Sequence, residues 1–100
     1  MKRILTLVLF VFFTVLAPRV DAAIVHHLKV EGIINPVISE FIIKGIEEAE
    51  NEDAEAVIIQ IDTPGGLDLS MRDIVKVMLA SEIPIVVYVA PPGSRAASAG

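Results

Sequence analysis

The sequence predicts an α/β fold built on a parallel sheet, in the order strand, helix, strand, helix, strand. Three short apolar runs rich in β-branched residues support this fold, at residues 24–30, 56–61 and 85–89. Between them lie two stretches in which apolar residues recur at helical spacing, and the connections are short. Parallel strands need such crossovers, which are right-handed in nearly all proteins. Because only residues 23–100 remain after a leader, we expect the front part of a larger domain.

Residues 1–22 have the three parts of a secretory signal peptide. Lys2 and Arg3 form the basic start, an apolar run follows at 4–17, and residues 20–22 offer a cleavage site. The apolar run is short for a bilayer span, which needs roughly twenty residues. An uncleaved anchor stays open as an alternative. In both cases we expect the rest of the chain to be exported.

The first predicted strand, at residues 24–30, leads to a helix whose start has two signals. Asn35 can accept a backbone N–H as a cap, and Pro36 suits the first helical position. We expect the helix to end within the acidic run at 47–53, because carboxylates are unfavourable at a helix C-terminus. That run is interpreted as a solvated face rather than a cation site. The apolar face of this helix comprises Ile38, Phe41, Ile42, Ile46 and Ala49.

The second half of the chain repeats this pattern. A strand at 56–61 ends in a turn at 62–66, and a helix follows in which Ser70 and Asp73 resemble a capping box. The third strand, at 85–89, shows no alternation, so we expect it to be buried on both faces. The apolar face of the second helix comprises Met71, Ile74, Val75, Met78 and Leu79, and its methionines are interpreted as core residues.

Charge and composition exclude several functions. Residues 23–100 hold five Lys or Arg against twelve Asp or Glu, a net charge of −7, so the basic patch of a nucleic-acid-binding protein is missing. The sequence has no cysteine, which excludes disulfides, thiolate metal sites and cysteine catalysis in this stretch. His26 and His27 are adjacent, so on a strand they point to opposite faces and cannot share one metal.

The loops that follow the second and third strands are predicted to share one edge of the sheet, where ligands usually bind. Gly65 and Gly66 in the first loop offer backbone N–H groups of the kind that stabilise an oxyanion. Ser98 in the second loop offers a hydroxyl beside the Ala99 amide, and we expect it near a helix start. A serine nucleophile with two backbone N–H donors suggests a serine hydrolase, but these loops do not supply its general base. Ser94 is a weaker candidate, since it lies nearer the Pro-Pro-Gly turn.

These features also have structural explanations. A Pro-Gly-Gly turn is usually only a turn, and runs of small residues often serve close packing. Residues 96–100 resemble the G-x-S-x-G elbow with Ala at its first position, but about seven residues separate the strand from Ser98, whereas that elbow turns directly from strand to helix. An α/β-hydrolase is therefore disfavoured. Neither phosphate-binding glycine pattern occurs.

Three motifs together, IDTPGG, SMRDIV and PIVVYVAPPGSRAASAG, closely resemble the NfeD-type membrane serine proteases. These are relatives of ClpP and signal peptide peptidase A within the ClpP/crotonase fold, and the resemblance spans the whole stretch after the leader. It implies that Ser98 is the nucleophile and that Gly65 and Gly66 belong to the oxyanion loop. Gly66 and Ala99 are the expected donors.

The same resemblance implies an extracytoplasmic, membrane-associated serine endopeptidase with a Ser/Lys dyad. It further implies substrates with apolar segments, stomatin- or prohibitin-like partners, a homo-oligomer, and no metal or organic cofactor. The lysine base is expected downstream of this sequence, because Lys29, Lys44 and Lys76 are predicted on a strand and two helices away from the loop edge. We therefore expect residues 1–100 alone to be inactive.

Two other functions stay open at this point. A non-catalytic relative would use the same groove to scaffold membrane partners, and loss of a downstream lysine would indicate it. An acyl-CoA enzyme of crotonase type would also use paired amides as an oxyanion hole. The exported leader argues against that enzyme, because CoA chemistry is intracellular.

Overall fold

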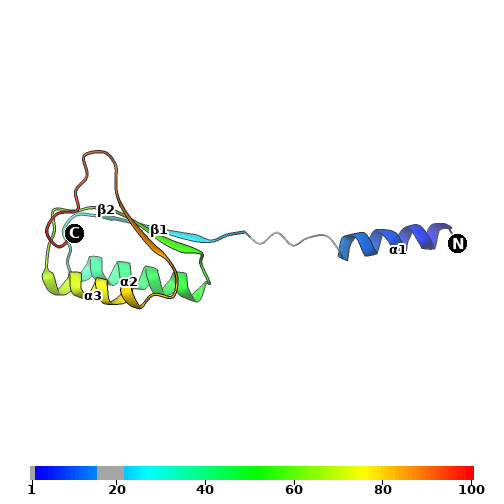
Figure 1. The fold of residues 1–100 in the computed structure, drawn as a ribbon, viewed down its shortest axis with the longest axis horizontal. Helices are drawn as coiled ribbons and strands as arrows, with labels where there is room; N and C mark the ends of the chain where they lie inside the picture. Colours follow the sequence, from blue (N-terminus) through cyan, green and yellow to red (C-terminus); the bar gives the residue numbers. More distant parts are fainter. Residues whose placement is uncertain (1, 16–21) are drawn as a thin grey trace.

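The computed structural model describes residues 2–15 and 22–100 (Figure 1). The three strands form one parallel sheet in the order β1-β2-β3. The predicted α/β class, with parallel strands joined by helices, is confirmed. The elements are α1 (Lys2–Val15), β1 (Val25–Glu31), α2 (Pro36–Asn51), β2 (Ala56–Asp62), α3 (Asp68–Ala80) and β3 (Ile85–Val89).

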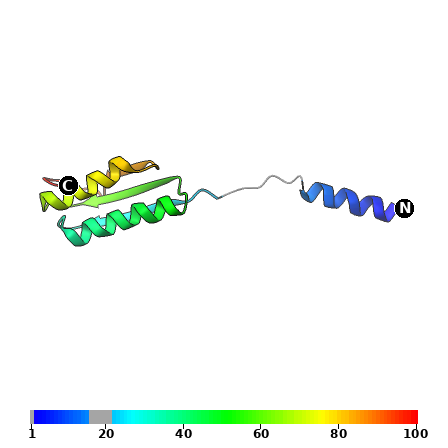
Figure 2. The same ribbon diagram turned by 90° about the horizontal axis from the view of Figure 1, so that it is seen from below.

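Both crossover helices cover the same face of the sheet (Figures 1 and 2). The strand order equals the chain order, so each right-handed crossover moves in the same direction and brings its helix to the same side. Alternate strand residues point toward α2 and α3 and form the core with Ile42, Ile46 and Ala49 of α2. The buried strand residues are Leu28, Val30, Val57, Ile59 and Ile61.

The opposite face of the sheet carries a polar row across all three strands. Gln60 on β2 lies between His27 on β1 and Tyr88 on β3. The His27 Nε2 atom lies 3.1 Å from Gln60 Oε1, and the Tyr88 hydroxyl donates to the same oxygen at 3.1 Å. His26, on the other face, lies 2.8 Å from the Glu52 carboxylate. The two histidines therefore point to opposite faces, as predicted.

The third strand is not buried on both faces, so that prediction is wrong. In β3, residues 86–89 are between 43% and 51% exposed within the described part of the chain. The reason is that β3 is an outer strand of the sheet formed by residues 22–100, and the helices of these residues lie on one face, while α3 packs mainly against α2. An apolar run without alternation therefore predicts a strand, but not which of its faces the helices cover.

The helix starts show which boundaries are set locally. Asn35 Oδ1 accepts the Ile38 N–H at 2.9 Å, and Pro36 opens α2, as predicted. By contrast, α3 starts at Asp68, before the predicted capping box, and Ser70 is buried inside its first turn. Leu67, the residue before α3, donates its N–H to the Ile34 carbonyl. A backbone bond between such distant residues leaves no local sequence signal. The end of α2 lies inside the acidic run, as expected.

The predicted leader falls only partly on residues that the structure describes. Lys2–Val15 forms α1, whereas residues 20 and 21 of the predicted cleavage site at 20–22 lie outside the described residues. Among the helices of residues 2–15 and 22–100, none combines the length and apolar character needed to cross a membrane.

Candidate active site

The loop between β2 and α3 is organised by Thr63, whose side chain is completely buried. Its Oγ1 atom accepts the Gly65 N–H at 3.1 Å and donates to the Gly65 carbonyl at 3.2 Å. Ile34 holds the other side of the loop: its N–H donates to the Gly65 carbonyl at 2.8 Å, and its carbonyl accepts the Leu67 N–H at 2.8 Å. The Pro-Gly-Gly turn is thus fixed by hydrogen bonds from two directions.

Residues 90–100, here called the serine loop, are attached to the same strand end. Thr63 donates its N–H to the Arg95 carbonyl at 2.7 Å, and its carbonyl accepts the Ala97 N–H at 3.2 Å. The Arg95 N–H also donates to Asp62 Oδ1 at 3.0 Å. The loops after β2 and β3 therefore meet at the carboxyl edge of the sheet, as predicted.

Ser98 lies against Gly65 in this arrangement. A Cβ built on Gly65 would lie 2.6 Å from Ser98 Cβ and 3.2 Å from Ser98 Oγ, so the contact requires a glycine. Gly65 has a φ of +113°, which glycine adopts readily and other residues rarely do. Ser98 is exposed and itself has a φ of +51°, an uncommon conformation that is often found at functional sites.

The helix start expected near Ser98 stays a prediction. Residues 98–99 form a turn, and the Gly100 N–H donates to the Ala97 carbonyl at 2.9 Å. Ser94, the weaker candidate, lies in the Pro-Pro-Gly turn, where its N–H donates to the Pro91 carbonyl at 3.0 Å.

The predicted donor groups differ in availability. The Gly65 N–H is already bonded to Thr63 Oγ1. Within residues 2–15 and 22–100, the Gly66 and Ala99 N–H groups carry no hydrogen bond. A Cβ on Gly66 would collide with the Ile34 backbone, so this position also needs a glycine. Both expected donors, Gly66 and Ala99, are therefore free, one in each of the two loops that meet around Ser98.

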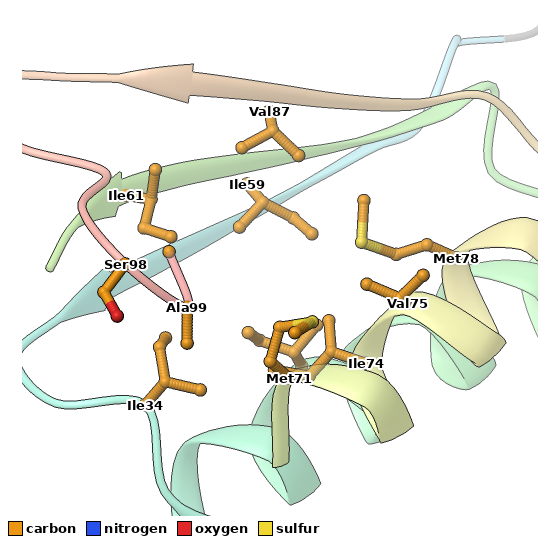
Figure 3. A pocket seen from close by; sticks show the side chains of 12 residues that line it. Ile34, Ile59, Ile61, Met71, Ile74, Val75, Met78, Val87, Ser98 and Ala99 are labelled. Atoms are coloured by element: carbon orange, nitrogen blue, oxygen red, sulfur yellow. The ribbon is translucent and has the colours of Figure 1, made fainter. Parts of the chain in front are cut away.

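An apolar pocket of about 330 Å³ opens beside Ser98, between α3 and the sheet (Figure 3). Ser98 and Ala99 lie at one end of it, next to Ile34. Pockets of this size accept small ligands or single large side chains. The predicted core role of the methionines is confirmed, and both also line the pocket. The other pocket-lining residues labelled in Figure 3 come from α3 (Met71, Ile74, Val75 and Met78) and from the sheet (Ile59, Ile61 and Val87).

The lysines of the described residues lie away from Ser98 and its pocket. Lys29 pairs with Glu31 at 3.2 Å, and Lys44 pairs with Glu40 at 2.9 Å. The hydrogen bond and the negative charge of Glu40 raise the pKa of Lys44, whereas a catalytic lysine needs a lowered pKa. In the described part of the chain, no lysine lines the pocket beside Ser98.

Sequence reasoning missed three residues that build this site: Thr63, Asp62 and Ile34. A threonine two residues before a glycine is a signal for a turn closed by a side-chain hydroxyl, so the role of Thr63 in the loop could have been found. The pairing of Ile34 with Gly66 joins two distant segments of the chain and has no local signal.

Comparison with known proteins places these observations in a family. Residues 24–100 match the family described as NfeD1b, N-terminal domain. The chain is 39% identical over 100 residues, its whole length, to membrane-bound protease PH1510 of Pyrococcus horikoshii. It is 32% identical over 82 residues, 82% of its length, to membrane protein NfeD1b of Bacillus subtilis. It covers 22% and 18% of these relatives, so it spans about a fifth of their length.

Solved structures give the same result. The 1510-N membrane protease of Pyrococcus horikoshii, specific for a stomatin homolog, matches 80% of this chain and 40% of its own, with a TM-score of 0.74 and 41% identity. A serine-to-alanine mutant of the 1510-N stomatin-specific protease matches 81% of this chain and 39% of its own, with a TM-score of 0.78 and 40% identity. A lysine-to-alanine mutant in complex with a substrate peptide matches 81% and 37%, with a TM-score of 0.77 and 41% identity. The chain therefore belongs to the NfeD1b N-terminal domain family.

Proposed function

We propose that the protein carrying this chain is a membrane-associated serine endopeptidase of ClpP/crotonase fold that acts outside the cytoplasm, with Ser98 as its nucleophile. The observation that carries the proposal is the contact between an exposed serine in a left-handed conformation and a glycine loop, beside an apolar pocket. The relatives support it, because one is a membrane-bound protease and the 1510-N structures belong to a stomatin-specific protease. Residues 1–22 are the export leader in this proposal.

The chemistry assigns one role to each group. Ser98 Oγ attacks the carbonyl carbon of the peptide bond and passes its proton to a neutral lysine. The Gly66 and Ala99 N–H groups donate to the carbonyl oxygen as it becomes negative. When this intermediate collapses, the C–N bond breaks and the lysine returns the proton to the leaving amine. Water then hydrolyses the ester by the same route and regenerates Ser98.

The base is proposed to lie downstream of Gly100. The lysine-to-alanine mutant of 1510-N, studied with a substrate peptide, supports a lysine in this role. Lys44 is unsuitable, because its pairing with Glu40 favours the protonated form. Residues 1–100 by themselves are therefore expected not to cleave peptides.

The pocket supports an apolar substrate. A large aliphatic or aromatic side chain placed there would leave water, and full burial of such a side chain contributes about 1.5–3 kcal/mol. Apolar segments of stomatin- or prohibitin-like membrane proteins are the proposed substrates, with a homo-oligomer as the working form. The 1510-N protease, specific for a stomatin homolog, supports this choice.

A fluorophosphonate probe with an apolar peptide arm tests the nucleophile. The probe forms a phosphorus–oxygen bond to an activated serine and releases fluoride. We expect mass spectrometry of the labelled full-length protein to place the adduct on Ser98, and the Ser94→Ala variant to keep it. An adduct on Ser94 would show that Ser94, and not Ser98, is the nucleophile. A folded protein that binds the peptide but takes no label would favour a non-catalytic scaffold.

A further inference from the structure

Thr63 is a buried residue that bonds to both loops of the candidate site. Its hydroxyl holds Gly65, and its backbone N–H and carbonyl hold Arg95 and Ala97 of the serine loop. It is 0% exposed, and its methyl group fills the space in which a Cβ of Gly100 would lie. No substrate can touch so buried a side chain, so any influence on the reaction has to pass through its neighbours.

The hydroxyl of Thr63 controls the direction of one peptide plane. The Gly65 carbonyl accepts from both Thr63 Oγ1 and the Ile34 N–H, at 3.2 and 2.8 Å. A peptide unit is planar and trans, so the Gly66 N–H points opposite to the Gly65 carbonyl. Fixing that carbonyl therefore fixes the direction of the Gly66 N–H.

The same hydroxyl also removes a competing donor. Thr63 Oγ1 accepts the Gly65 N–H at 3.1 Å, which leaves Gly66 as the glycine of this loop with a free N–H among the described residues. On the other side, the backbone bonds of Thr63 hold residues 95–97, the segment of the serine loop that leads to Ser98. The positions of Ser98 and of the free Gly66 N–H thus both depend on Thr63.

We propose that Thr63 is a positioning residue, whose hydroxyl aims the Gly66 N–H at the reacting carbonyl oxygen while its backbone holds Ser98 in register. This inference rests on the proposed function. Because an oxyanion donor acts mainly in the transition state, loss of this hydroxyl slows the chemical step and leaves binding of the uncleaved peptide nearly unchanged.

The test compares Thr63→Val with Thr63→Ser in the full-length protein. Valine keeps the shape and removes the hydroxyl, whereas serine keeps the hydroxyl and removes the methyl group. We expect Thr63→Val to lower kcat roughly 10- to 100-fold, as misplacement of a catalytic group does. Thr63→Ser should stay within about 3-fold of the wild type, since the orienting hydrogen bonds remain. Peptide affinity, measured in a Ser98→Ala background, should change less than about 2-fold in both.

Two controls keep the result interpretable. Ser39→Ala removes another buried hydroxyl, outside the site, and is expected to leave kcat unchanged. If Thr63→Val does not fold, Thr63→Cys replaces it, because a thiol is only a weak hydrogen-bond donor and acceptor. Wild-type kcat in a variant without the hydroxyl would overturn the role of Thr63, and so would lost peptide affinity with unchanged kcat. A wild-type protein without any cleavage would overturn the proposed function itself.

Discussion

Gly65 and Ser98 meet across the two loops with no space for additional atoms. A Cβ on Gly65 would lie 2.6 Å from Ser98 Cβ and 2.9 Å from the Ala97 carbonyl oxygen, and the φ of +113° already disfavours other residues. Two separate effects, steric contact and backbone strain, therefore act at one position. A second glycine of the chain allows them to be separated.

Gly65→Ala is expected to reduce kcat/KM at least roughly 100-fold, because the new methyl group displaces Ser98. Gly93→Ala is the matched control: Gly93 also has a positive φ, of +91°, but nothing lies within 4 Å of its Cβ position. Both variants should lose about 1–2 kcal/mol of stability from backbone strain, measured by urea unfolding. Only Gly65→Ala should lose activity. Equal activity of the two variants would contradict the proposed role of this contact in catalysis.

At the residue scale, sequence reasoning depended on residue type and position after a strand. Small residues at the carboxyl ends of two parallel strands were enough to select Gly65 and Ser98, which the structure brings into contact. Their catalytic roles stay predictions. The orientation of the Gly65–Gly66 peptide could not be predicted from the sequence. It depends on Ile34, which is distant in the chain, as well as on the nearby Thr63.

The two core helices differ in how their starts are determined. In α2, Asn35 and Pro36 supply the cap and the first position, so the start could be read from adjacent residues. In α3, the Leu67 N–H bonds to the Ile34 carbonyl and no side chain caps the helix, so the start depends on the fold. The exposure of β3 was missed for a related reason. The apolar pattern gives the strands, but their order in the sheet decides which face the helices cover.

Asn35→Ala tests the local control of α2. We expect a loss of about 1 kcal/mol, within a range of about 0.5–2, because the Ile38 N–H loses the side-chain acceptor that lies 2.9 Å away. The exposed Asn51, at the other end of α2, provides the control, and its change to alanine should stay within about 0.5 kcal/mol. Urea unfolding measures both. Equal losses would show that the Asn35 cap does not stabilise the helix.

The whole described fold creates the pocket by leaving α3 separated from the edge strand. Both helices lie on one face, α3 packs mainly against α2, and the space between α3 and β2–β3 opens beside Ser98 (Figure 3). The sequence predicted the elements that enclose this space. It did not predict the space itself, because residues such as Met71 and Met78 have the same helical spacing in a filled core as in a pocket wall.

Val75→Asp is expected to weaken binding of apolar peptides, since Val75 lines the pocket. A carboxylate there would resist loss of water, and KM should rise at least roughly 10-fold while kcat changes little. Leu79→Asp is the control on the same helix, because Leu79 is 84% exposed and is not a pocket residue. Steady-state kinetics with one apolar peptide distinguishes the two variants. An equal rise in KM for both would argue against the pocket as the binding site.

The central claim is that Ser98 is the nucleophile of a peptidase. Its most direct test is cleavage of an apolar peptide by the full-length protein and by its Ser98→Ala variant, with circular dichroism to verify equal folding. We predict cleavage by the wild type and none above background by the variant. Equal cleavage by both would contradict the assignment of Ser98, and a folded wild type that cleaves no peptide would contradict the enzyme itself.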